Sequence, residues 1–374
     1  MVFGLRPYCM RRRMFNLIAP FIRLPVVGLD ISDRSMKYLK FRRAGTNRID
    51  VDYFGELDIP EGLIANGEIR DVRGLTELLR EWRVKERKKI KGCFFAVSLP
   101  EEKSFLRLIQ IPRVPFDDIP NAVRWEIENQ IPFAIEDVIF DYELVTPLKQ
   151  EDAQDHFDAV IVAFPKAVVE SYVRSLEGAE LPLLALELES QAITRACIAS
   201  VPTSLSRIIL DVGRTRTSII IFSGTAIVYT STIDLGGLIF EKRLAKALNI
   251  SMDEATVLKK EIGLNKREHD GDIFRALAPM VSVLTDELVR ATEFYQQHPA
   301  HVHGAVPAIH EILLCGGDAN LIGLDTYLAS IVKVPVIHAD PFTAIRGRTL
   351  FDIPPIARHQ ALAFTTTIGL ALRA

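Results

Sequence analysis

VVGLDISDRSMKYLKF, residues 26–41, and RIILDVGRTRTSIIIF, residues 207–222, repeat one pattern half a chain apart. In each copy an aspartate, Asp30 or Asp211, ends an apolar strand, and a tight polar turn leads into a second strand. Burying an aspartate there costs free energy unless a metal ion, a water or N–H donors face it. Small and hydroxyl residues let backbone N–H groups approach an anion, while a carboxylate can hold a hydrated metal ion. One copy could simply cap a turn, but two predict paired phosphate-binding hairpins facing one nucleotide across a cleft.

Composition indicates an ordinary globular protein. The chain has 374 residues, of which 48% are apolar and 25% charged, which leaves room for about two domains. A net charge of −3 gives no general reason to expect nucleic-acid binding, because no excess of Lys and Arg is available to displace counterions. The four cysteines, Cys9, Cys93, Cys197 and Cys315, are scattered singly, so neither a zinc site nor a disulfide framework is indicated.

The sequence does not predict a membrane span. The closest candidate, 361–372, is shorter than the roughly 18 to 20 residues required and contains three threonines. Near the start, Arg11–Arg13 precede the apolar stretch 14–22. We interpret 1–23 as a leader, with Met14 as a possible true start, and keep contact with an anionic membrane surface as the alternative.

The spacing of apolar residues predicts alternating strands and helices. In the first half we expect strands within 26–53, with a reversal at Gly45–Asn47, and further strands over 94–100, 105–111, 138–145 and 157–164. We expect helices over 71–89, 117–130, 166–176 and 183–199. In the second half we expect helices over 238–248, 273–297 and 358–373, a helix from Ser251 to Glu261 with a Ser251–Glu254 capping box, and a strand over 309–314.

A third segment, a strand that ends in paired glycines, is a further candidate for ligand binding. The strand at 309–314 runs into Cys315, Gly316 and Gly317. Paired glycines let the backbone lie against a ligand, and a following helix N-terminus favours negative charge. A single Gly-Gly can equally be a structural turn, and its position after the two hairpins favours the binding interpretation.

Several motifs together resemble one family. WEIENQIPF (125–133) followed by Asp141-Tyr142, Asp234–Gly237, the segment 254–259 and the closing GLALR (369–373) are similar to the PilM family of type IV pilus assembly proteins, within the actin-like ATPase superfamily. The placement of the segment between the two hairpins also resembles the cell-division protein FtsA. The similarity covers about 26–373. It implies an α/β fold: an actin-like (ribonuclease H-like) two-lobed ATPase fold with an inserted βαββα subdomain of the FtsA/PilM type.

The resemblance also implies a division of the chain. After the leader, 1–23, we expect lobe 1 (24–103), the inserted subdomain (104–181), a return to lobe 1 (182–203), lobe 2 (204–237), its small subdomain (238–305), the rest of lobe 2 (306–355) and a closing helix (356–374).

The implied site binds ATP and Mg²⁺ between the lobes. Asp30 and Asp211 would hold the metal, and with Glu189 they are the expected catalytic residues. The expected nucleotide-binding residues are Ser32, Asp33, Arg34, Ser35 and Lys37 in the first hairpin, Gly213, Arg214, Thr215, Arg216 and Thr217 in the second, and Gly236, Gly237, Glu254, Lys259, Gly316, Gly317 and Asn320 beyond them.

The hairpins depart from the family pattern. Ser32 stands where glycine is usual, and Asp33 adds negative charge where phosphates should lie. Arg214 and Arg216 replace small residues, and they could pair with phosphates and compensate for Asp33, or face solvent.

Hydrolysis has weaker support in the sequence. Glu189 is the best candidate to orient a water toward the γ-phosphate, with Glu187 the runner-up, although either could be an ordinary solvated carboxylate. We therefore expect a slow ATPase at most.

The inserted subdomain is the expected partner site. Ile119, Val123, Ile127 and Ile131 have helical spacing and predict a core-facing stripe, whereas Trp125 lies on another face and could line a groove. The resemblance implies a PilN-like N-terminal cytoplasmic tail of an inner-membrane protein as partner.

The function implied by the resemblance is a cytoplasmic ATP-binding adaptor, held at the inner membrane by partners and able to self-associate. The alternatives are an active ATPase or phosphotransferase and an FtsA-like filament former, although that class generally carries a membrane helix beyond the point where this chain stops. His298, His301 and His303 are more typical of a polar loop than of a metal site.

Overall fold

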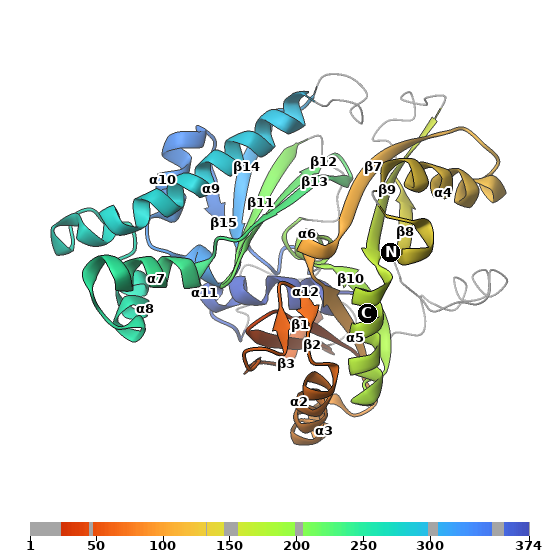
Figure 1. The fold of residues 1–374 in the computed structure, drawn as a ribbon, viewed down its shortest axis with the longest axis horizontal. Helices are drawn as coiled ribbons and strands as arrows, with labels where there is room; N and C mark the ends of the chain where they lie inside the picture. The colour runs from red at the N-terminus through yellow and green to blue at the C-terminus, as the bar shows by residue number, and fades with distance from the viewer. Residues whose placement is uncertain are drawn as a thin grey trace.

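The computed structural model describes residues 24–44, 48–131, 133–145, 156–198, 205–297, 306–345 and 355–373. They form two lobes with a smaller unit beside the first lobe (Figure 1). The leader 1–23, the reversal at 45–47 and the histidine loop at 298–303 lie outside the described residues.

Each lobe is built on a five-stranded sheet of the same topology. In lobe 1 the strand order is β10-β6-β1-β2-β3, with β1 Val26–Ile31, β2 Ser35–Ala44, β3 Arg48–Asp58, β6 Phe94–Leu99 and β10 Leu183–Leu188. In lobe 2 it is β13-β12-β11-β14-β15, with β11 Ser206–Val212, β12 Thr217–Ser223, β13 Ala226–Ile233, β14 Ile309–Cys315 and β15 Val336–His338. In chain order, the first three strands of each sheet (β1 to β3 and β11 to β13) pair antiparallel with one another. The last two strands of each sheet run parallel to its first strand. The repeated hairpins thus begin the same sheet twice, and the predicted two-lobed α/β fold is confirmed.

Helices cover these sheets. In lobe 1, α2 Val72–Lys85 packs against α5 Lys166–Gly178, the last helix of the expected inserted segment, and α6 Glu189–Cys197 packs against α12 Thr365–Ala371, which lies on β1. Lobe 2 carries α7 Gly237–Leu248, α8 Met252–Glu261, α9 Asp272–Gln297 and α10 Leu324–Val332, and the short helices are α3 Arg87–Ile90 and α11 Arg358–Ala361. Close packing of α12 depends on Gly28, because a Cβ there would lie 2.2 Å from the carbonyl oxygen of Thr367. The predicted Ser251–Glu254 capping box at α8 is present.

The inserted segment forms a small sheet with its own core. Its strands are β7 Phe105–Pro112, β8 Val138–Leu144 and β9 His156–Pro165, in the order β7-β9-β8. The helix α4 Ile119–Gln130 lies on this sheet, and its predicted stripe is buried there with residues of β7 and β9. The core-facing interpretation of the stripe is confirmed, and Trp125 on the other face is 63% exposed.

Two element predictions were wrong. The expected helix over 183–199 is a buried parallel strand, β10, followed by α6, because a short apolar run does not distinguish a buried strand from a buried helix. The expected closing helix over 358–373 is interrupted at Leu362–Phe364, where the carbonyl of Leu362 accepts a hydrogen bond from the N–H of Gly316.

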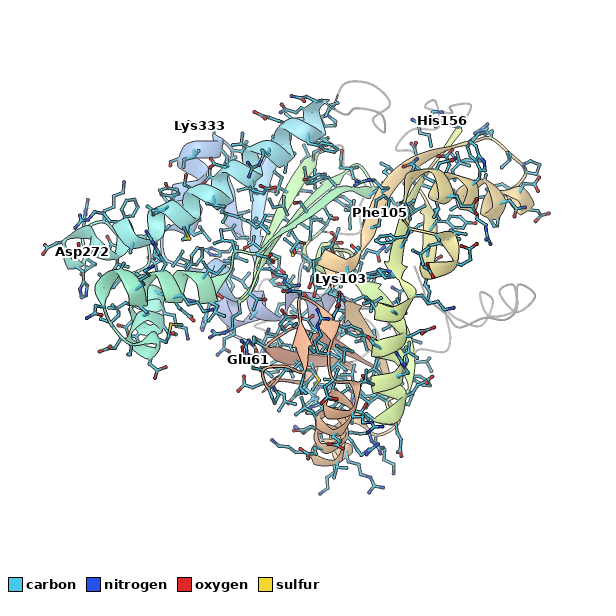
Figure 2. All side chains as sticks on the ribbon, viewed as in Figure 1. Glu61, Lys103, Phe105, His156, Asp272 and Lys333 are labelled. Carbon is cyan, nitrogen blue, oxygen red and sulfur yellow. The ribbon has the colours of Figure 1, made fainter. Side chains whose placement is uncertain are left out.

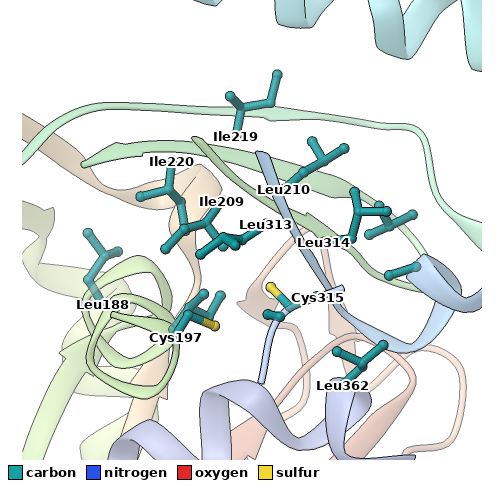
Figure 3. Packing of buried hydrophobic residues seen from close by; sticks show 14 of the residues in the cluster. Leu188, Cys197, Ile209, Leu210, Ile219, Ile220, Leu313, Leu314, Cys315 and Leu362 are labelled. Atoms are coloured by element: carbon teal, nitrogen blue, oxygen red, sulfur yellow. The ribbon is translucent and has the colours of Figure 1, made fainter. Parts of the chain in front are cut away.

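The lobes meet over a buried apolar layer beneath their shared cavity. Figure 3 shows Cys315 at the end of β14 facing Cys197 of α6, with Ile209 and Leu313 beside them. Cys93, Cys197 and Cys315 are buried free thiols. No helix among the described residues is long and apolar enough to cross a bilayer.

Candidate functional site

A cavity of about 600 Å³ lies between the lobes. It opens where β1, β6, β10, β11 and β14 end, as expected of open α/β sheets, in which ligands bind outside the carboxyl ends of parallel strands. The expected site residues that line it are Asp30, Ser32, Asp33, Arg34, Ser35, Lys37, Glu189, Asp211, Gly213, Arg214, Thr215, Arg216, Lys259, Gly316 and Gly317. Residues from both hairpins therefore share one cavity.

The two aspartates lie in this cavity with little compensation for their charge. Asp30 accepts a hydrogen bond from Ser98 Oγ at 2.8 Å, and Asp211 lies 3.7 Å from the Cys315 thiol. Burial raises the pKa of Asp30 against the opposing effect of Lys37. Burial, with the charge of Asp30, raises the pKa of Asp211 to about 6. Because both carboxyl groups disfavour ionisation here, a divalent cation between them would relieve a real electrostatic cost.

Two glutamates extend this acidic cluster. Glu189 is the first residue of α6, and burial, followed by the charges of Asp30, Glu101 and Asp211, raises its pKa well above the usual value. Glu101 is buried, accepts the N–H of Ser190 at 3.1 Å, and has a pKa raised by burial to about 7. Sequence reasoning missed Glu101. Its signal was its position just after β6, since parallel strands end at one edge of a sheet.

Glu187, the runner-up to Glu189, does not line the cavity. Its buried carboxylate lies between two arginines, with Arg195 Nη1 at 2.8 Å and Arg373 Nη1 at 2.9 Å. Burial acts to raise its pKa, but the two arginines lower it overall. Glu187 therefore fixes the C-terminal segment to β10 and leaves Glu189 as the candidate that faces the cavity.

The two arginines of the second hairpin make different contacts. Arg216 of lobe 2 reaches across the cleft to Asp33 at 2.9 Å and contacts Glu102, both in lobe 1. Arg214 is about half exposed and lies 3.4 Å from Glu241. Arg216 thus compensates for Asp33 directly and joins the lobes, whereas Arg214 keeps most of its guanidinium in solvent.

Glycines let the backbone segments of lobe 2 approach closely. Gly316 has a φ of +90°, and a Cβ there would lie 2.4 Å from the carbonyl oxygen of Val212. Gly236 and Gly237 do not line the cavity. The N–H of Gly237 donates to the carbonyl of Gly213 at 3.0 Å, so this pair seats the start of α7 against the second hairpin. Thr217 is buried, and its hydroxyl donates to the carbonyl of Leu235 at 2.6 Å.

Lys259 connects this cavity to a second one. Its ammonium lies 2.7 Å from Glu241 and contacts Asp318, a residue that sequence reasoning did not single out. The second cavity, about 460 Å³, is lined by Lys259 and Asn320 among others, and the Asn320 amide donates to the carbonyl of His359 at 2.8 Å. Glu254 lies elsewhere, exposed in its capping box with Ser251.

The donor set fits a magnesium nucleotide. Nine acidic and six basic side chains line the first cavity, so a bound polyanion needs an accompanying cation. Among the described residues no cluster of three or more His, Cys, Asp or Glu side chains forms a complete metal site. Mg²⁺ is commonly held by one or two carboxylates, with waters and phosphate oxygens as its other ligands. Asp30 and Asp211 suit that arrangement.

A match over nearly the whole chain identifies the family of this protein. Residues 28–374 match the family model of the type IV pilus assembly protein PilM. The chain belongs to this family. The resemblance drawn from WEIENQIPF and the accompanying motifs is therefore confirmed.

Solved structures confirm the fold. A structure titled "PilM-PilN type IV pilus biogenesis complex" is 24% identical with a TM-score of 0.74, covering 94% of this chain and 99% of the other. MreB 5 of Spiroplasma citri bound to AMPPNP is 14% identical with a TM-score of 0.56, covering 94% and 96%. The ethanolamine utilization protein EutJ from Carboxydothermus hydrogenoformans is 16% identical with a TM-score of 0.54, covering 95% and 92%.

Proposed function

We propose that this PilM-family protein binds Mg-ATP in its interlobe cavity and acts as an adaptor whose partner binding depends on the nucleotide. The observation that carries the proposal is that Asp30 and Asp211, from two separate hairpins, line one cavity large enough for a nucleotide. The MreB relative is described as bound to AMPPNP, which supports a nucleotide in the same fold.

Each part of the ligand has a suitable region in this site. Asp30 and Asp211 would hold Mg²⁺, which would neutralise phosphate charge. The hairpin backbone and Lys37 would contact phosphates, since Lys37 lies beside Ser35 Oγ at 3.0 Å and lines the cavity. The second cavity, beyond Lys259 and beside Asn320, would receive the nucleoside.

We expect slow turnover at most. Glu189 lines the cavity, but burial and the charges of Asp30, Glu101 and Asp211 raise its pKa and so disfavour the ionised form that a general base needs. A cation bound nearby would favour its ionised form. Measurement of phosphate release by wild type and by Glu189→Gln would show whether this residue contributes.

The proposed partner is a PilN-like cytoplasmic tail that docks on the inserted subdomain, for which we propose the bounds 104–181. The relative of known structure is a PilM–PilN complex, and the described part of the subdomain exposes three large apolar side chains. These are Phe116 (76% exposed), Trp125 (63%) and Phe133 (52%). Such a partner would hold the protein on the cytoplasmic side of the inner membrane.

Arg216 gives a physical route for coupling. Its charge is satisfied by Asp33 and Glu102 of the opposite lobe. A triphosphate in the cavity would compete for this guanidinium and so alter how the lobes are joined. By reciprocity, a peptide that favours one arrangement of the lobes must change ATP affinity by the factor with which ATP changes peptide affinity.

The nucleotide part is tested by calorimetric titration of Mg-ATP. Wild type should bind, and Asp30→Asn should lose at least about tenfold in affinity, because it removes one carboxylate ligand of the metal. Asp253→Asn, an exposed acidic change on α8, is the matched control and should bind as wild type does. Unchanged binding by Asp30→Asn, or no binding by wild type, would overturn this part.

The proposed partner binding is tested with a peptide that corresponds to the N-terminal cytoplasmic tail of a PilN-like protein encoded in a neighbouring reading frame. Trp125→Ala should weaken peptide binding, whereas Val283→Ala, an exposed apolar change on α9, should not. Equal binding by the two variants would refute docking on this face without affecting the nucleotide result.

A further inference from the structure

A dense cluster of positive charge lies at the end of lobe 1 away from the cleft. Lys85, Arg87, Lys88, Lys89 and Lys91, here named the basic tip, occupy the end of α2, the short helix α3 and the turn after it. All five are exposed, and Glu86 is the single acidic residue within 85–91. Figure 1 places α2 and α3 at the lower end of the molecule, and Figure 2 shows long side chains extending into solvent there.

These charges have little internal compensation. Among the described residues, no ion pair joins Lys85, Arg87, Lys88 or Lys91 to a carboxylate, and Lys89 lies over the ring of Tyr53 at 4.8 Å. Like charges three or four positions apart on a helix destabilise it. One or two cations near a helix C-terminus are stabilising, but five in seven residues repel one another. The cluster is therefore not explained by the stability of the helices that carry it.

The backbone of the basic tip is nevertheless held firmly. Trp82, which precedes it, and Ile90, which lies within it, are both buried. Lys40 of β2 donates to the carbonyl of Lys89 at 3.1 Å, and the N–H of Cys93 donates to the carbonyl of Ile90 at 3.1 Å. The charges are thus presented on a fixed surface, together with the 65% exposed side chain of Val84.

We propose that the basic tip binds the surface of a membrane rich in anionic phospholipids. Complementary charge is the main argument, since five exposed cations face outward at one end of the molecule. A specific protein partner generally needs buried aromatic or aliphatic anchors, and Val84 is the one large apolar side chain exposed between 84 and 91. None of the five lines either of the two cavities described above. The contact is independent of the nucleotide and would add to a partner that holds the protein near the membrane.

The test is sedimentation of the full chain with lipid vesicles. One set of vesicles contains phosphatidylcholine alone, and the other contains about 30% phosphatidylglycerol. The tip variant carries Lys85→Gln, Arg87→Gln, Lys88→Gln and Lys91→Gln, and the control variant carries Lys242→Gln, Arg243→Gln, Lys246→Gln and Arg267→Gln on exposed positions of lobe 2. Both variants lose four positive charges, so a difference between them reports position and not net charge.

Wild type should bind the anionic vesicles and not the neutral ones. Each basic residue near an anionic surface contributes roughly fivefold in affinity, so the tip variant should bind at least ~20-fold more weakly after screening by salt. The control variant should lose less than ~3-fold. Equal losses in the two variants, no binding by wild type, or tighter binding of wild type to duplex DNA than to anionic vesicles would overturn the proposal. Circular dichroism of both variants would show that the fold is retained.

Discussion

Replacing Asp211 with asparagine should stabilise the nucleotide-free protein at neutral and alkaline pH. The carboxyl group is buried beside Asp30, and its pKa is raised from 3.8 to about 6 in the folded protein. Among the residues that the structure describes, its hydrogen-bond donor is the weak thiol of Cys315 at 3.7 Å. An amide of the same shape removes the charge and leaves the packing unchanged.

The magnitude follows from the linkage between proton binding and folding. Because the folded-state pKa of Asp211 lies above the unfolded-state value, its favourable contribution is present below about pH 4 and is lost as pH rises through about 6. At about 1.4 kcal/mol per pKa unit, the full loss above pH 7 is about 3 kcal/mol. The variant lacks this loss. The free energy of unfolding of Asp211→Asn minus that of wild type should therefore rise from near zero at pH 4 to about 3 kcal/mol at pH 8.

The assay is urea unfolding at several pH values, followed by circular dichroism and by tryptophan fluorescence, because coincident transitions are needed to treat a two-lobed protein as two-state. Asp253→Asn, at an exposed position, should stay within about 0.5 kcal/mol of wild type throughout. The variant should also lose Mg-dependent ATP binding. A destabilised Asp211→Asn at pH 8, or a difference that does not change with pH, would refute the reasoning.

Two further pairs of substitutions, each with its own comparison variant, probe the packing around the cavity. Arg216→Ala leaves two mostly buried carboxylates of the other lobe without their partner, and it should reduce the free energy of unfolding by about 2 kcal/mol, whereas Arg214→Ala, half exposed, should cost less than about 0.5 kcal/mol; chemical denaturation compares them. Gly316→Ala should cost more than about 2 kcal/mol, since its φ is +90° and the added Cβ would meet a carbonyl oxygen at 2.4 Å. Gly62→Ala, with a φ of +94° and no atom within 4 Å of the new Cβ, is the control and should cost about 1 kcal/mol. Equal costs for the two glycines would contradict the role assigned to close backbone approach.

Sequence reasoning succeeded where the determining signal is local. The alternation of apolar residues, the aspartate at each strand end and the Ser251–Glu254 capping box all depend on neighbouring positions, and they predicted the hairpins and most elements correctly. It failed at 183–199, where burial of a parallel strand decides the conformation, and at 362–364, where a carbonyl bonds a distant turn.

Within the candidate site, the sequence pointed to both hairpins but not to all their neighbours. Glu101 was missed because it enters the site at the end of β6, an element distant in sequence from both hairpins. Asp318 stands between the predicted residues Gly317 and Asn320, but only the tertiary structure brings it into contact with Lys259 of α8. Glu187 and Glu189 differ by two positions, yet one is enclosed by arginines and the other faces the cavity. No local pattern distinguishes them, because the turn from β10 into α6 sets their directions.

The sequence by itself determined that two aspartate-ended hairpins exist and that the chain has the motifs of its family. The tertiary structure alone decided that Arg216 joins the lobes through Asp33, and that Glu101 and Glu189 gather beside the two hairpin aspartates at the cavity. The physical reason is the separation along the chain over which each kind of interaction acts. Strand and turn preferences act between adjacent residues, whereas burial and charge interactions act between groups that only the packing of two lobes brings together.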